Sequence, residues 1–79
     1  MIKLLIVDDH PIILEGSKNL FNDVPDIFVD TLEDIQSFAQ VIEETAYDVF
    51  FIDVNLGVSS GLTLAEIVKE ESPSSIVIL

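Results

Sequence analysis

Three aspartates stand directly after two apolar runs. Asp8 and Asp9 follow the run Leu4–Val7, and Asp53 follows Val49–Ile52. Carboxylates that lie close together repel one another, so a folded chain must shift a pKa, supply a basic partner or bind a cation. None of the three lysines stands beside these acids in the sequence. Oxygen ligands suit Mg²⁺ or Mn²⁺, so the pattern predicts a divalent-metal site.

Each acid has a simpler interpretation when it is taken alone. An aspartate after a strand is commonly a helix cap or a solvated turn residue. The metal interpretation therefore depends on whether Asp8, Asp9 and Asp53 meet in space.

The elements that must position these acids alternate along the chain. Continuous apolar runs are typical of strands buried on both faces, and apolar residues at helical spacing indicate amphipathic helices. The expected strands are 4–7, 27–29, 49–52 and 75–79, and the helical stripes span 13–20, 35–42 and 64–68. The order β-α-β-α-β-α-β predicts an α/β fold, with a parallel sheet and helices on both faces. Ligands bind such sheets at the carboxyl ends of the strands, where all three acids stand.

Composition limits the function classes. Fifteen acidic residues against three lysines give a net charge of −12, which repels nucleic acid and anionic membranes and attracts cations and basic partners. There is no cysteine, so no disulfide or thiolate metal site is expected. The 79 residues suffice for one small domain, and no apolar run is long enough to span a bilayer. We expect a cytoplasmic protein that contacts neither DNA nor a membrane.

Three segments resemble the receiver domain of two-component response regulators: LLIVDDHP, FFIDVNLGVSSG and SSIVIL. Gly61, eight positions after Asp53, also fits the family pattern. The Asp-Asp-His-Pro sequence is similar to regulators that carry a LuxR-type output domain. The resemblance implies a flavodoxin-like (CheY-like) doubly wound parallel sheet with strand order 2-1-3-4.

The resemblance also implies a role for each site residue. Asp53 would be the phosphoacceptor, and a sensor histidine kinase would supply the phosphoryl group. Asp9 would bind Mg²⁺ or Mn²⁺ directly and Asp8 would support it, with Asp53 and the backbone carbonyl of Asn55 as further ligands. Such a module regulates transcription through a separate output domain and is not an enzyme, although family members promote their own phosphorylation and dephosphorylation. His10 is interpreted as a surface loop residue, with a catalytic base as the alternative.

The receiver family has five β-α units, whereas this chain ends at Leu79, inside the expected fourth strand. Residues 1–79 are therefore interpreted as a truncated receiver domain. The alternative that they are a fragment of a longer regulator stays open. The resemblance implies that the family's Ser or Thr directly after the fourth strand, its Lys at the end of the fifth strand and its last two helices are missing. We expect metal binding to survive and phosphorylation to be weakened or lost. The exposed fourth strand and an uncovered helix face predict a dimer or larger oligomer.

Two other functions stay open. The chain could be a non-switching interaction module that binds metal without phosphotransfer. It could also be a metal-dependent hydrolase with an aspartate nucleophile, like the haloacid-dehalogenase phosphatases. Enzymes of that class carry an Asp-x-Asp motif after their first strand, whereas Asp8 and Asp9 are adjacent here.

Overall fold

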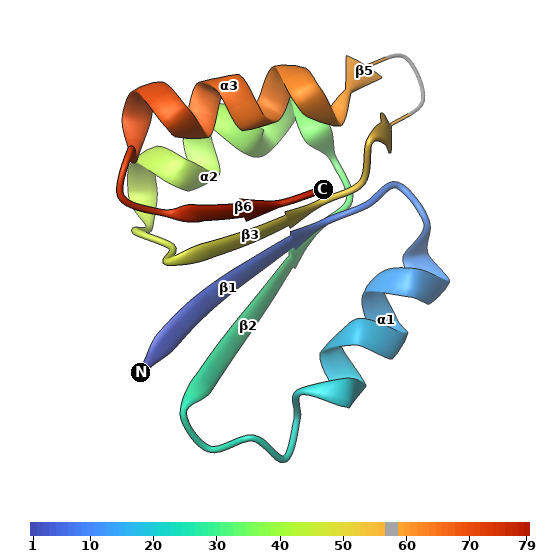
Figure 1. The fold of residues 1–79 in the computed structure, drawn as a ribbon. Coiled ribbons are helices and arrows are strands. Elements are labelled where there is room, and N and C mark those ends of the chain that lie inside the picture. The colour runs from blue at the N-terminus through green and yellow to red at the C-terminus, as the bar shows by residue number, and fades with distance from the viewer. Residues whose placement is uncertain (57–58) are drawn as a thin grey trace.

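The computed structural model describes residues 1–56 and 59–79. Figure 1 shows a parallel sheet with helices on both of its faces. The main elements are β1 (Ile2–Val7), α1 (Pro11–Leu20), β2 (Ile27–Leu32), η1 (Ile35–Ser37), α2 (Phe38–Glu44), β3 (Val49–Ile52), α3 (Gly61–Glu71) and β6 (Ile76–Ile78). The two short strands β4 (Asn55–Leu56) and β5 (Ser59–Ser60) form a separate antiparallel ribbon.

The main sheet has the strand order β2-β1-β3-β6, and all of its pairs are parallel. Counted along the four main strands, this is the predicted order 2-1-3-4. Strand β1 is central, because β2 pairs with one of its edges and β3 with the other. The strand β6 lies at an edge of the described sheet.

The core has two layers, one on each face of the sheet. Helices α2 and α3 cover one face and α1 covers the other (Figure 1). Successive side chains of a strand point to opposite faces, so Leu5 and Phe50 enter the α2–α3 layer while Leu4 and Phe51 enter the α1 layer. Burial on both faces explains why Leu4–Val7 of β1 and Val49–Ile52 of β3 are continuous apolar runs. Phe50 makes edge-to-face ring contacts with Phe38 and Tyr47, with centroids 6.2 and 5.8 Å apart.

The helix α1 covers its face of the sheet only in part. It begins at Pro11, where a missing N–H costs nothing, and Leu14 is its buried residue. The stripe recognised from the sequence through Ile13 and Leu20 is exposed, with Leu20 74% accessible. It borders an open groove of about 620 Å³ between α1 and the sheet. The helix face expected to be uncovered is therefore exposed in the structure.

Side-chain hydrogen bonds hold the segment before β3. The Tyr47 hydroxyl donates to Asp30 Oδ2 of β2 at 2.5 Å, so it reaches past the central strand. The Ser75 hydroxyl donates to the Tyr47 carbonyl oxygen at 2.7 Å and lies 2.6 Å from the Ser72 hydroxyl. These contacts connect three segments that are distant in sequence. No helix in the described part of the chain has the length and apolar character needed to cross a membrane.

Candidate functional site

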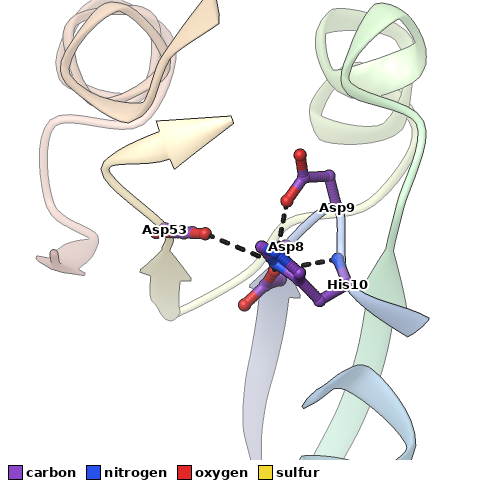
Figure 2. A group of neighbouring side chains, drawn as sticks. All are labelled: Asp8, Asp9, His10 and Asp53. Carbon is purple, nitrogen blue, oxygen red and sulfur yellow. Dashed lines mark hydrogen bonds and ion pairs between the residues drawn. The ribbon is translucent and has the colours of Figure 1, made fainter. Parts of the chain in front are cut away.

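Backbone pairing brings the three predicted acids to one edge of the sheet. Val7 is the register partner of Ile52, so Asp8 and Asp53 are the next residues of two adjacent strands. The Asp53 N–H donates to the Val7 carbonyl at 3.0 Å, and the Asp8 N–H donates to the Leu32 carbonyl at 3.2 Å. Figure 2 shows the side chains of Asp8, Asp9 and Asp53 grouped at this edge. The juxtaposition predicted from the sequence is therefore confirmed.

His10 lies among these acids, with its Nδ1 atom facing them (Figure 2). Nδ1 is 2.7 Å from Asp8 Oδ1, 2.9 Å from Asp9 Oδ1 and 3.9 Å from Asp53 Oδ2. The hydrogen bond to Asp8 and the charge of Asp9 raise the pKa of His10 above its usual value. The ring is 64% exposed, as a loop residue would be, but its interpretation from sequence as a surface residue missed these contacts. The signal was available, because a histidine beside two acids in a chain with three lysines is a natural counter-charge.

One oxygen of Asp9 has no hydrogen bond. The Asp9 side chain is partly exposed, yet its Oδ1 atom is buried and lacks a hydrogen-bond partner. His10 Nδ1 is only 2.9 Å away, but its hydrogen bond goes to Asp8 Oδ1, so the approach to Asp9 is an ion-pair contact by distance alone. A buried carboxylate oxygen without a donor is costly unless a cation or a water serves it.

The spacing of the site fits a small divalent cation. One ligand atom from each of Asp8, Asp9, His10 and Asp53 lies within 4.8 Å of all the others. Opposite ligands of an octahedral Mg²⁺ ion are roughly 4.2 Å apart, since each lies about 2.1 Å from the metal. These residues could therefore hold the ion after a small adjustment. Asn55 begins β4, and the metal-binding role of its carbonyl stays a prediction.

The start of α3 rests directly on the backbone that carries Asp53. The Gly61 N–H donates to the Val54 carbonyl at 3.0 Å. A Cβ atom at Gly61 would lie 2.9 Å from the Asp53 carbonyl carbon, 3.0 Å from the Val54 Cα, and closer still to the Asp53 carbonyl oxygen. Only glycine permits this approach, which gives a structural reason for a glycine eight residues after Asp53.

Residues 4–79 match the family model of the response regulator receiver domain. The chain belongs to this receiver family. The interpretation made from the three sequence motifs is thus confirmed, and the hydrolase alternative loses its support.

Two curated relatives are similar to this receiver domain over most or all of its length. The transcriptional regulatory protein ComA of Bacillus subtilis is 32% identical over 82 residues, which cover 100% of this chain and 38% of ComA. The sensory transduction protein LytR of Staphylococcus haemolyticus is 33% identical over 69 residues, which cover 86% of this chain and 27% of LytR. The chain thus spans well under half the length of either relative.

Solved receiver structures share the fold. The response regulator TrrA of Thermotoga maritima, in complex with Mg²⁺ and BeF, superposes with a TM-score of 0.87 at 26% identity, over 100% of this chain and 68% of TrrA. TrrA in complex with the histidine kinase ThkA gives 0.86 at 26% identity, over 100% of this chain and 67% of TrrA. The beryllofluoride-activated NtrC4 receiver domain dimer gives 0.87 at 27% identity, over 99% of this chain and 64% of the receiver-domain chain in that structure. The CheY-like fold expected from the resemblance is confirmed.

Proposed function

We propose that this receiver domain accepts a phosphoryl group on Asp53 from a sensor histidine kinase, with Mg²⁺ held by Asp8, Asp9 and Asp53. The observation that carries the proposal is the convergence of these carboxylates at the carboxyl edge of β1 and β3. The Asp53 side chain is 27% exposed, so a donor can reach it from solvent. Mn²⁺ would serve the same oxygen ligands.

The chemistry is an exchange of one bond at phosphorus. A carboxylate oxygen of Asp53 forms a bond to phosphorus while the bond from phosphorus to the donor's imidazole nitrogen breaks, and that nitrogen keeps the electron pair. Such transfers depend mainly on positioning and charge stabilisation. The backbone hydrogen bond from Asp53 to Val7 and the glycine contact at Gly61 fix the position of the nucleophile. Bound Mg²⁺ would neutralise charge on the carboxylates and the incoming phosphoryl oxygens.

The signal would reach transcription through an output domain, and the protein would act in the cytoplasm. ComA is by its name a transcriptional regulator, and the TrrA–ThkA structure pairs a receiver with a kinase. The net charge of −12 disfavours direct contact with nucleic acid or an anionic membrane. The domain would be a phosphoprotein that turns over no separate substrate, so it is not proposed as an enzyme.

Acetyl phosphate provides the test. The chain is incubated with acetyl phosphate and Mg²⁺, and its intact mass is measured. We expect a low yield of an adduct of one phosphoryl group, in line with the weakened phosphorylation expected from the sequence, and we expect this adduct to be lost in Asp53→Asn and without Mg²⁺. Asp34→Asn is the matched control, since Asp34 is an exposed aspartate that caps η1. An adduct that persists in Asp53→Asn would refute the assignment.

The alternative is a non-switching interaction module that binds metal only. Exposed apolar side chains favour it: Leu20 on α1, and Ile76 and Ile78 on the edge strand β6. Either surface could mediate a dimer, as exposed edges and apolar patches do. No phosphoryl adduct, together with a dimer that forms as concentration rises in light scattering, would support this function over phosphotransfer.

A further inference from the structure

We propose that His10 is an additional protein ligand of the metal site, so that the receiver binds imidazole-preferring divalent cations such as Co²⁺, Ni²⁺ and Zn²⁺ more tightly than its carboxylates alone would. The proposal rests on the proposed function, because the same acids hold the ion. It concerns the identity of the cation and leaves the role of Asp53 unchanged.

The distances from Nδ1 to Asp8 and Asp9 match those between neighbouring ligands of one ion. Adjacent ligands of an octahedral ion lie roughly 3.0 Å apart when each is about 2.1 Å from the metal. Nδ1 lies 2.7 Å from Asp8 Oδ1 and 2.9 Å from Asp9 Oδ1, close to this spacing. Asp53 Oδ2, at 3.9 Å, is nearer to the spacing of opposite ligands. A ring nitrogen and three carboxylate oxygens thus approach the corners of one coordination sphere.

The backbone of His10 also fixes this approach. Its N–H donates to Asp8 Oδ1 at 2.9 Å, so backbone and ring are both directed to the same carboxylate. The exposed ring can make a small rotation without disturbing the core. The imidazole nitrogen is a ligand that suits Zn²⁺, Ni²⁺ and related metals, whereas Mg²⁺ is better served by oxygen.

A competing explanation treats His10 only as a counter-charge to the acids. A bound metal would then displace the ring, and removing the ring would strengthen the binding of every cation. The orphan oxygen of Asp9 favours coordination instead. Asp9 Oδ1 is buried and shares an ion-pair contact but no hydrogen bond with Nδ1, so a cation bound by both atoms would give this oxygen a direct ligand bond.

The deciding quantity is the ratio of Ni²⁺ affinity to Mg²⁺ affinity, measured by isothermal titration calorimetry in wild type, His10→Ala and Ile12→Ala. Ile12 is the matched control because it is exposed in the same turn and lies outside the cluster. We expect the ratio to fall about tenfold or more in His10→Ala, since even outer-shell partners of a metal contribute 10–100-fold. The ratio should be unchanged in Ile12→Ala. An equal ratio in His10→Ala and wild type, or tighter binding of both metals in His10→Ala, overturns the proposal.

A direct measurement is possible because the chain has a single histidine. Nitrogen-15 NMR with diamagnetic Zn²⁺ reports which ring nitrogen binds the metal. We expect the Nδ1 resonance to shift on titration in wild type and to stay in place in Asp53→Asn at the same Zn²⁺ concentration. A Zn²⁺ titration that saturates while Nδ1 does not move overturns the assignment.

Failure of this inference is distinguishable from failure of the proposed function. One outcome is that Mg²⁺ binds wild type but not Asp53→Asn, while the ratio of Ni²⁺ to Mg²⁺ affinity is the same in wild type and His10→Ala. In that case the ligand role of His10 is wrong, and the proposed site of Asp8, Asp9 and Asp53 stands. If wild type binds neither Mg²⁺ nor Ni²⁺, both are wrong. Circular dichroism of each variant confirms that it is folded.

Discussion

Replacing Gly61 with alanine tests how the start of α3 is held against the loop that carries Asp53. The new methyl group would meet backbone atoms of Asp53 and Val54, which cannot rotate away as a flexible side chain can. Helix or loop must therefore move. The hydrogen bond from the Gly61 N–H to the Val54 carbonyl is then stretched, and Asp53 shifts relative to Asp8 and Asp9.

The magnitude follows from opposing terms. Forcing an extra methyl group into a packed site costs about 1–3 kcal/mol, and losing the backbone hydrogen bond costs about 1 kcal/mol. Alanine offsets about 0.4–1 kcal/mol, because it reduces the conformational freedom of the unfolded chain. We expect a net loss of about 1–4 kcal/mol in the free energy of unfolding. Each kcal/mol lowers the Tm of a domain of this size by roughly 4–8 °C.

Gly16→Ala is the matched control for this substitution. Gly16 lies in α1, and a Cβ atom there would have nothing within 4 Å. Alanine should raise stability there by up to about 1 kcal/mol through helix propensity. Urea unfolding followed by circular dichroism gives both free energies, and calorimetry gives the Mg²⁺ affinity, which should fall only in Gly61→Ala. If Gly61→Ala is as stable as Gly16→Ala, the contact between α3 and the Asp53 backbone is not restrictive and the reasoning fails.

Other variants test the core and the segment before β3. Phe50→Ala should cost about 3–5 kcal/mol in urea unfolding because it empties the α2–α3 layer, whereas the exposed Phe28→Ala should cost under about 1 kcal/mol; equal losses would contradict the assigned core. Burial and the hydrogen bond to Asp30 raise the pKa of Tyr47 to about 12. A raised pKa means that the protonated Tyr47 side chain stabilises the folded state. Since unfolded tyrosine titrates near pH 10, this contribution to the free energy of unfolding should be complete below about pH 10 and should disappear toward pH 12. Urea unfolding between about pH 10 and pH 12 should show this loss of stability in wild type and should not show it in Tyr47→Phe. Ser75→Ala should cost about 1 kcal/mol in urea unfolding through its lost hydrogen bond to the Tyr47 carbonyl, and no loss would refute that contact.

The sheet and the acid cluster could be predicted because both leave local patterns. Strands buried on two faces are continuous apolar runs, and parallel strands end at the same edge, so the acids after Val7 and Ile52 had to meet if β1 and β3 were neighbours. The receiver resemblance supplied that neighbour relation. Strand β2 was recognised only over its first three residues, because Asp30 and Thr31 interrupt its apolar pattern while its pairing with β1 continues to Leu32.

Contacts that depend on side-chain direction were not visible in the sequence. Apolar spacing placed Ile13 and Leu20 on one face of α1 but did not indicate that Leu14 alone would be buried in this helix. The sequence offered His10 as a counter-charge to the acids, but the turn after β1 decides the direction of its ring, and it places Nδ1 against Asp8 and Asp9. The β4–β5 ribbon forms through the backbone pairing of Asn55 with Ser60, and strands this short are not long enough to show a periodicity that would predict them.

The pairing of Val7 with Ile52 makes the separation of the acid-bearing positions a property of the main chain. Neighbouring strands lie about 4.8 Å apart whatever side chains they carry. Apolar residues of the two layers can therefore be exchanged for others of similar volume without altering the distance between the backbone positions of Asp8 and Asp53. Substitutions in the interior should accordingly lower the thermal stability of the domain well before they change the spacing of the acids at the proposed metal site.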